Sequence, residues 1–191
     1  MEKKFLLKSK TLEKEKKIIL GNRIPKDFFV TSGIGESDIT IHAGSFHLAL
    51  KDAGIEKYNI MNYSSILPAI ANKIEKPKEL VHGSVMESIM ACSNSRRGQR
   101  ATAGLIWGWL LNKETGEKHG GLVCEYNSHK AVKDAEETLK KSLLELYEGF
   151  KIDFDLKDIE ISLKSFVPKK KFGTALVSLC FVNYEFPVLE N

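Results

Sequence analysis

The chain has 191 residues, of which 42% are hydrophobic and 28% are charged, and its formal net charge is +4. This balance is typical of a globular protein with a sizeable core, and it excludes a largely disordered chain. No apolar run reaches the length of a membrane span, and residues 1–20 lack the apolar centre of a signal peptide. We therefore expect a cytoplasmic protein that does not enter a membrane.

Residues 1–22 form a basic segment, which we separate from a single domain over residues 23–191. Acidic Glu2, Glu13 and Glu15 interrupt the basic run, and no aromatic stacking pattern accompanies it. A solvated arm therefore explains the segment better than a nucleic-acid-binding surface, and we expect no nucleic-acid partner.

The first half of the domain predicts two strands separated by a helix. Residues 28–31 read as a core strand, and residues 42–53 read as a helix with Gly54 at its C-terminal cap. The second strand covers residues 59–63. The Ser64–Ser65 pair therefore falls at a strand end, where chemically active groups tend to be exposed.

The second half is rich in β-branched and aromatic runs, which are typical of strands. Strands are predicted over residues 85–91, 102–111, 122–126, 159–166 and 174–184. Turns are expected at 112–116 and 168–171, and residues 93–100 read as an exposed basic loop. Since few helices accompany these strands, we expect a layered α/β fold with largely antiparallel sheets.

One longer helix is predicted over residues 130–148, with Ser128 as its N-cap. Its buried stripe is predicted to consist of Val132, Ala135, Leu139, Leu143 and Leu146.

The remaining motifs point away from metals and nucleotides. The cysteines Cys92, Cys124 and Cys180 stand singly among apolar neighbours, which indicates buried free thiols. The five histidines lack paired ligand spacing, so no metal site is expected. Residues 33–35 read GIG, without the third glycine of a dinucleotide loop or the following lysine of a P-loop.

Four segments carry a resemblance to a known family. They read TSGIGESD at 31–38, HAGSFHLALKDAGI at 42–55, NIMNYSSILP at 59–68 and GGLVCEY at 120–126. In this order and spacing the chain resembles the pyruvoyl-dependent arginine decarboxylases from about residue 25 to about residue 187. The resemblance implies a sheet-on-sheet sandwich with outer helices and self-cleavage between Ser64 and Ser65. It also implies trimers, or higher assemblies, of cleaved pairs, with active sites between neighbouring subunits.

The chemistry of the family explains why a serine is needed at position 65. Decarboxylation of an α-amino acid leaves a carbanion at Cα, which requires an electron sink that ordinary side chains do not offer. Ser65 Oγ can attack the Ser64 carbonyl carbon and convert the peptide bond into an ester. β-Elimination of this ester releases Ser64 as a new C-terminus and leaves dehydroalanine at position 65. Hydrolysis by water with loss of ammonia then gives a covalent pyruvoyl group, whose ketone takes the substrate amine as a Schiff base. By itself, a serine pair at a strand end is an ordinary turn.

Two further residues match the family's catalytic positions. Asn59 matches the asparagine that serves self-cleavage, although an asparagine here could also simply fasten a turn. Glu125 matches the proton donor that returns a proton to Cα. Since Glu125 shares an alternating face with Val123, we expect it to be buried and to favour its protonated form. Glu87 poses the same question, and there a structural ion pair is an equal alternative.

The substrate side of the site departs from the family pattern. The family's helix can supply an aspartate for the guanidinium where this chain has His47, and an imidazole does not attract a cation. Glu36 or Asp38 could take over the carboxylate role, with His42 and His47 as pocket walls. Alternatively, the substrate is a different amino acid, or arginine is bound in another register. His47 could equally be a plain surface residue.

Two functions remain open from the sequence. The first is a self-processing decarboxylase that converts L-arginine to agmatine, with ornithine or lysine as the alternative substrate. The second is an uncleaved, non-catalytic relative with a structural or regulatory role. Retention of Ser65, Asn59 and Glu125 together favours the enzyme.

Overall fold

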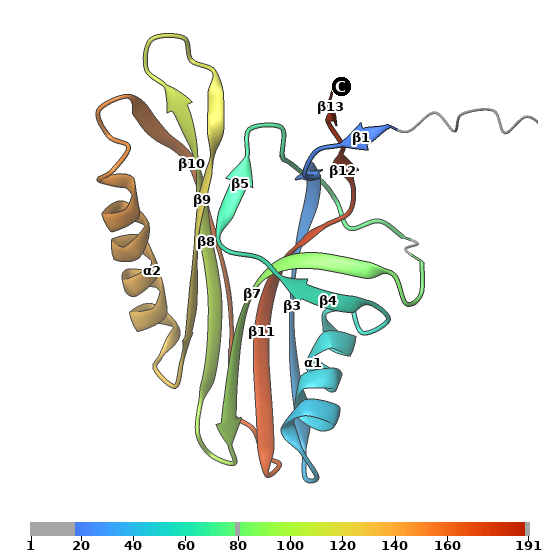
Figure 1. Cartoon of the computed structure of the whole chain (residues 1–191). Helices are drawn as coiled ribbons and strands as arrows, with labels where there is room; N and C mark the ends of the chain where they lie inside the picture. Colours follow the sequence, from blue (N-terminus) through green and yellow to red (C-terminus); the bar gives the residue numbers. More distant parts are fainter. Residues whose placement is uncertain (1–17, 79–80, 190–191) are drawn as a thin grey trace, which may run out of the picture.

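Two β-sheets pack face to face between two helices in a computed structural model that describes residues 18–78 and 81–189 (Figure 1). The five-stranded sheet has the order β4 (Asn59–Asn62), β7 (Val85–Arg96), β11 (Phe172–Phe181), β3 (Asp27–Ser37) and β6 (Asn72–Lys73). The four-stranded sheet has the order β10 (Phe154–Phe166), β8 (Ala101–Asn112), β9 (Lys118–Ser128) and β5 (Ile66–Pro68).

Most of the strand pairs are antiparallel, as predicted. All ladders of the four-stranded sheet are antiparallel, and so are those of β11 with β3 and β7. The short strands β4 and β6 instead pair parallel with β7 and β3. The predicted layered α/β class is therefore confirmed.

The main hydrophobic core lies between the two sheets because apolar side chains from both inner faces alternate inward. It contains Phe28 of β3, Ile89 of β7, Trp107 of β8, Val123 of β9 and Leu179 of β11, each at most 2% exposed. Two smaller cores lie under the helices, one on the outer face of each sheet. The fold thus has four layers: helix, sheet, sheet and helix.

The helix α1 (His47–Asp52), which continues a π-helical turn η1 (Ile41–Phe46), lies directly on β3. Gly33 and Gly35 make this close approach possible. A Cβ at Gly33 would collide with the Ala49 carbonyl oxygen, and one at Gly35 with that of Ser45. The GIG segment of the sequence therefore serves helix packing.

The helix α2 (Val132–Tyr147) covers the four-stranded sheet, but it begins later than predicted. The prediction of Ser128 as N-cap is wrong, because Ser128 ends β9 and Ala131 is the N-cap. The Ser128 Oγ instead accepts a hydrogen bond from the Lys130 N–H at 3.2 Å. The expected burial of Val132 and Leu146 is also wrong, since they are 42% and 48% exposed at the edges of a narrower stripe. Its buried members are Ala135, Leu139 and Leu143.

The other predicted strands are present, and several are longer. Only residues 97–100 form a turn in the predicted basic loop, because β7 continues through Arg96 with Ser93 and Ser95 buried. Ser93 Oγ donates a hydrogen bond to the Ser128 carbonyl at 2.9 Å, so this buried hydroxyl has a hydrogen-bond partner.

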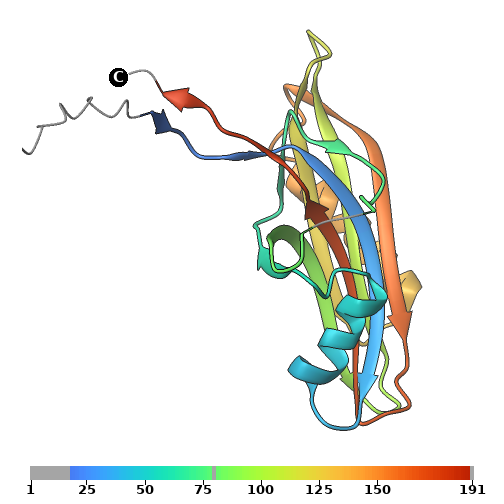
Figure 2. The same ribbon diagram turned by 90° about the vertical axis from the view of Figure 1, so that its right-hand side faces the viewer.

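The two ends of the described chain pair with each other and extend away from the sandwich (Figure 2). β1 (Ile19–Leu20) pairs with β13 (Val188–Leu189), and β2 (Ile24–Pro25) pairs with β12 (Tyr184–Glu185). Most of the predicted arm over 1–22 lies outside the described residues. Within residues 18–78 and 81–189, no helix has both the length and the apolar character needed to cross a membrane.

Candidate active site

The Ser64–Ser65 peptide bond lies in the short connection between the two sheets. β4 belongs to the five-stranded sheet and β5 to the four-stranded one, so residues 63–65 carry the chain from one sheet to the other. The Tyr63 N–H donates to the Ser88 carbonyl at 2.7 Å, and the Ser65 carbonyl accepts from the Val123 N–H at 3.1 Å. The bond is therefore held from both sides by different sheets.

The Ser65 hydroxyl is paired with a carboxylate. Ser65 Oγ donates to Glu125 Oε1 at 2.5 Å, so two residues far apart in the sequence meet where β9 passes the start of β5. Ser65 is half-buried. A carboxylate at this distance from a hydroxyl is positioned to accept its proton.

The expectation that Glu125 is buried is wrong, because its side chain is exposed in the chain. It does share a face with the buried Val123, but β5 pairs with β9 only from Gly120 to Leu122. Beyond that point β9 forms the edge of its sheet, and the Glu125 carboxylate reaches solvent beside Ser65.

Asn59 has contacts of the kind that fasten a turn. Its Nδ2 donates to the Gly83 carbonyl at 2.8 Å, and its own N–H donates to the Ser84 carbonyl at 2.9 Å. Asn59 begins β4, whereas the serine pair follows the other end of that strand. The structure therefore does not bring the Asn59 amide together with Ser65 in the way that it brings Glu125.

A cavity of about 590 Å³ adjoins the connection between the sheets. It is lined by Arg23, Ile24, Pro25, Asn62, Tyr63, Ser64, Ile66 and Pro68. Arg23 Nε donates to Glu87 Oε2 at 3.2 Å, and Arg23 Nη2 contacts Glu87 Oε1. Glu87 is only 1% exposed, and its contact with Arg23 makes it a structural ion pair, which was one of the two alternatives for this residue.

Two titratable neighbours of the site stay protonated near neutral pH. Burial, with a contribution from Tyr63, raises the pKa of Tyr184 to about 12 even though Arg23 lies 5.6 Å from its ring centre. Burial and the charge of Glu125 raise the pKa of Cys124 to about 11. The Cys124 thiol is therefore no competing nucleophile beside Ser65.

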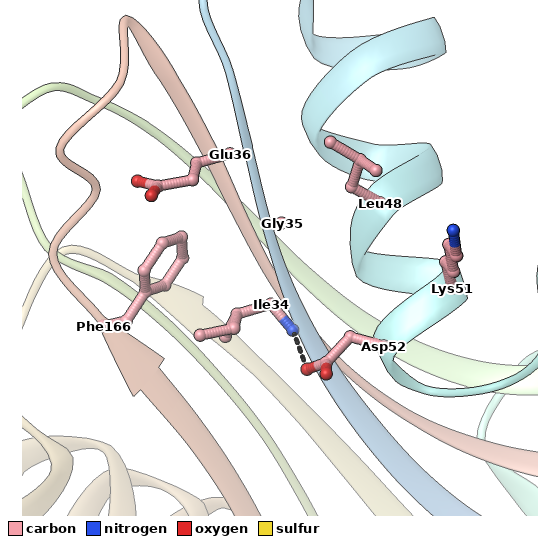
Figure 3. Close-up of a pocket in the computed structure, with 7 residues that line it drawn as sticks. All are labelled: Ile34, Gly35, Glu36, Leu48, Lys51, Asp52 and Phe166. Carbon is pink, nitrogen blue, oxygen red and sulfur yellow. Dashed lines mark hydrogen bonds between the residues drawn. The ribbon is translucent and has the colours of Figure 1, made fainter.

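A second cavity, of about 580 Å³, lies between α1, β3 and the end of β10 (Figure 3). Its lining consists of Ile34, Gly35, Glu36, Leu48, Lys51, Asp52 and Phe166. Asp52 Oδ2 accepts a hydrogen bond from the Ile34 N–H at 2.9 Å, which is the dashed line in Figure 3. A carboxylate, a cation and an aromatic ring are thus combined in one hollow.

The two predicted substrate carboxylates are already engaged within the chain. Glu36 Oε2 accepts the N–H groups of Lys169 and Lys170 at 2.7 and 3.3 Å. Asp38 Oδ1 accepts the Lys171 N–H at 3.0 Å and lies 3.5 Å from Arg97 Nη2. Both carboxylates therefore fasten the basic turn that follows β10.

The predicted histidines lie on the surface of the same region. His47 begins α1 and is exposed, and His42 is exposed with its ring stacked on Phe46 at 5.7 Å. His47 is thus compatible with either of its two interpretations.

Glu36 and Ser65 are far apart in one chain. Glu36 is in register with Gly173 of β11, and Gly173 with Ser95 of β7. The connection between the sheets meets β7 at Ser88, roughly 23 Å back along that strand at about 3.3 Å per residue. One chain therefore holds the serine–carboxylate pair and the α1 cavity as separate halves.

Sequence reasoning missed three of the charged residues that line these cavities. Lys51 and Asp52 share a helix face with Leu48 at spacings of three and four residues, so helical periodicity could have placed them together. Arg23 carried no such signal, because its partner Glu87 is distant in the sequence.

The fold and the site define a four-layer sandwich with a serine–carboxylate pair at the connection between its sheets. A family model described as pyruvoyl-dependent arginine decarboxylase (PvlArgDC) matches residues 27–186, and the chain belongs to this family. It is 33% identical to pyruvoyl-dependent arginine decarboxylase 1 of Methanosarcina acetivorans over 159 residues, which are 81% of this chain and 93% of that protein. It is 34% identical to pyruvoyl-dependent arginine decarboxylase AaxB of Chlamydia caviae over 192 aligned positions, covering 86% and 94% of the two chains.

The Arg23–Glu87 pair makes a prediction about stability. Arg23→Met leaves the Glu87 carboxylate buried without its counter-charge, and we expect a loss of about 1–3 kcal/mol in the free energy of unfolding. The double variant Arg23→Met, Glu87→Met should recover most of this loss, because it removes both charges. Urea unfolding of the two variants measures the difference, and equal stability of the single and double variants would contradict it.

Proposed function

We propose that the chain cleaves itself between Ser64 and Ser65, converts Ser65 into a pyruvoyl group and then decarboxylates L-arginine to agmatine and carbon dioxide. The observation that carries the proposal is the 2.5 Å hydrogen bond from Ser65 Oγ to Glu125 Oε1 at the connection between the sheets. Family membership supports the same chemistry, since the matching model and the relatives carry the name pyruvoyl-dependent arginine decarboxylase.

The proposed cleavage begins at a bond that the fold already holds in place. Ser65 Oγ and the Ser64 carbonyl carbon belong to adjacent residues of one chain, so the attack is intramolecular. Such arrangements reach effective molarities on the order of 10⁵ M. Glu125 accepts the hydroxyl proton as Oγ attacks, which makes the oxygen a better nucleophile. The resulting ester then eliminates, with Ser64 leaving as a free carboxylate.

The two products stay associated through strand pairing. The fragment that ends at Ser64 would keep β3 and β4, and the fragment that begins at residue 65 would keep β7 and β11. β3 pairs with β11 along its length, and β4 pairs with β7. We therefore expect cleavage to alter the connection between the sheets without separating the sandwich.

The residues around position 65 suit a pyruvoyl group. Such a group supplies a ketone that binds the substrate amine and accepts the electron pair left behind by carbon dioxide. Glu125 lies next to position 65 and can hold the proton that Cα needs after decarboxylation. The cavity of about 590 Å³ at Ser64 and Ile66 offers room for a small amino acid beside the same position.

Substrate recognition requires a second copy of the chain in this proposal. Glu36, Asp38 and His47 stay our candidates for recognising the substrate, and they belong to the α1 end of the sandwich. Because that end lies roughly 23 Å along the sheet from the serine pair, a neighbouring subunit must supply it. A trimer of cleaved pairs, as in the family resemblance, would place the two halves together.

We keep two alternatives because Glu36 and Asp38 already bind the turn after β10. Either ornithine or lysine is the substrate, or the chain stays uncut as a structural or regulatory relative. Both alternatives account for His47 at the position where the family can carry an aspartate.

The two neighbouring serines provide a matched pair of variants. Ser65→Ala removes the nucleophile, so the chain should stay whole, whereas Ser64→Ala keeps it and should still be cut. Denaturing gel electrophoresis of the purified proteins distinguishes the two results. Cleavage of Ser65→Ala, or an uncut Ser64→Ala chain with a wild-type fold, would contradict the assignment of the nucleophile.

Glu125→Gln should slow self-cleavage by about 10²-fold or more, because general-base assistance typically contributes at least that factor. The rate is measured by following newly synthesised chains on denaturing gels. Glu160→Gln is the control, since Glu160 is a half-buried carboxylate that pairs with Lys73 and lies on β10, which β8 and β9 separate from β5. Similar rates for both variants would rule out Glu125 as the base.

The substrate is tested by carbon dioxide release from L-arginine, L-ornithine and L-lysine, with the amine product identified by mass spectrometry. We expect arginine to be consumed fastest and agmatine to form. A preference for ornithine or lysine would support the proposed decarboxylation and contradict arginine as the substrate.

A further inference from the structure

We propose that the backbone N–H of Ile66 is the hydrogen-bond donor that stabilises the Ser64 carbonyl oxygen while the chain cleaves itself. The inference rests on the proposed function, because it concerns the step that creates the pyruvoyl group. It assigns to a main-chain group a role that the sequence had left to the Asn59 side chain.

The donor is already in place in the uncut chain. The Ile66 N–H donates to the Ser64 carbonyl oxygen at 2.9 Å and closes a three-residue turn centred on Ser65. The carbonyl at the other end of this hydrogen bond is the one that Ser65 Oγ attacks. A hydrogen bond polarises that carbonyl and strengthens as its oxygen becomes negative.

The pairing of β5 with β9 leaves the Ile66 N–H free for this task. The Ser65 carbonyl accepts from the Val123 N–H at 3.1 Å, so residue 65 faces β9 with its carbonyl one position before the paired residues Ile66 and Leu122. This pair is then of the non-hydrogen-bonded type, and the Ile66 N–H points away from β9. Since β5 is the edge strand of its sheet, that side carries no further strand of the described chain.

Asn59 is less suited to be the donor. Its Nδ2 is 2.8 Å from the Gly83 carbonyl, and its backbone N–H bonds the Ser84 carbonyl. These contacts fix Asn59 at the start of β4, whereas Ser64 follows the other end of that strand. Asn59 therefore serves cleavage by positioning β4, while Ile66 acts on the reacting carbonyl.

The step balances without any added reactant. The Ser65 Oγ proton passes to Glu125, the Oγ–C bond forms at the Ser64 carbonyl carbon, and the carbonyl electron pair moves onto the oxygen that Ile66 holds. When that pair returns, the C–N bond between residues 64 and 65 breaks, and the Ser65 nitrogen takes the proton from Glu125. The result is an ester isomer of the same chain. The Ile66 N–H stabilises the carbonyl oxygen in this step, and Glu125 carries the proton from Oγ to the nitrogen.

The first test compares Ile66→Pro, which has no backbone N–H, with Ile66→Val, which keeps it. Ile66 is 61% exposed and lies on an edge strand, where proline is tolerated, so both variants should fold. We expect Ile66→Pro to cleave about 10²-fold more slowly than wild type and Ile66→Val to stay within about threefold of wild type. The rate is followed on denaturing gels from the time of synthesis, and circular dichroism confirms the fold.

A second test keeps the side chain and avoids the proline ring. In semisynthetic protein, the amide of residue 66 is replaced by an ester, which removes the same N–H group. The matched control is the same replacement at Asn72, whose N–H donates to the Lys26 carbonyl at 2.9 Å, outside the connection between the sheets. The replacement at residue 66 should slow cleavage by about 10²-fold and clearly more than the one at Asn72.

The outcomes separate this inference from the proposed function. If wild type is cut and the residue 66 ester is cut at the same rate, or no more slowly than the Asn72 ester, the Ile66 donor is refuted and self-cleavage stands. If wild type is never cut, both the donor and the proposed function fail.

Discussion

The connection between the two sheets over residues 63–65 is the constraint on which the rest of the site depends. Tyr63 is hydrogen-bonded to β7 and Ser65 to β9, so the Ser64–Ser65 bond cannot move away without breaking one of these two hydrogen bonds. Holding the chain this way fixes a hydroxyl beside its own preceding carbonyl and beside Glu125. An ordinary turn of free serines would lack this fixed geometry, because its residues could rotate away from one another.

The surrounding fold maintains that connection. The inter-sheet core holds the sheets face to face, and Tyr63 joins it through its contact with Phe181, with ring centres 5.8 Å apart. The buried Glu87 and its partner Arg23 fasten the paired chain ends next to the same cavity. Arg23 precedes the residues that the family model matches, so this chain adds a contact to the site from outside the matched region.

The opposite end of the sandwich is built by different means. Gly33 and Gly35 let α1 approach β3 closely, and that contact forms one wall of the second cavity. Glu36 and Asp38 fasten the turn after β10 through hydrogen bonds to its backbone N–H groups. The serine–carboxylate pair and the α1 cavity thus lie at opposite ends of the fold and are positioned by different elements.

Strand patterns were enough to predict a layered α/β class with largely antiparallel sheets. The family resemblance added the sandwich of sheets and selected Ser65 and Glu125, which the structure brings to 2.5 Å. Alternation could not show that Glu125 is exposed, because its exposure depends on where β5 ends in space. Likewise, a helical stripe placed Leu146 in the core, although α2 contacts its sheet only along Ala135, Leu139 and Leu143. The Ile66 hydrogen bond depends on backbone geometry, which side-chain patterns do not encode.

Intact-mass spectrometry of the purified protein under denaturing conditions tests the central claim most directly. The account predicts two fragments, residues 1–64 and 65–191, the second lighter by one ammonia than simple hydrolysis would leave it. That mass identifies a pyruvoyl group at position 65. A single uncut chain, or a second fragment that begins with an intact serine, would contradict the account.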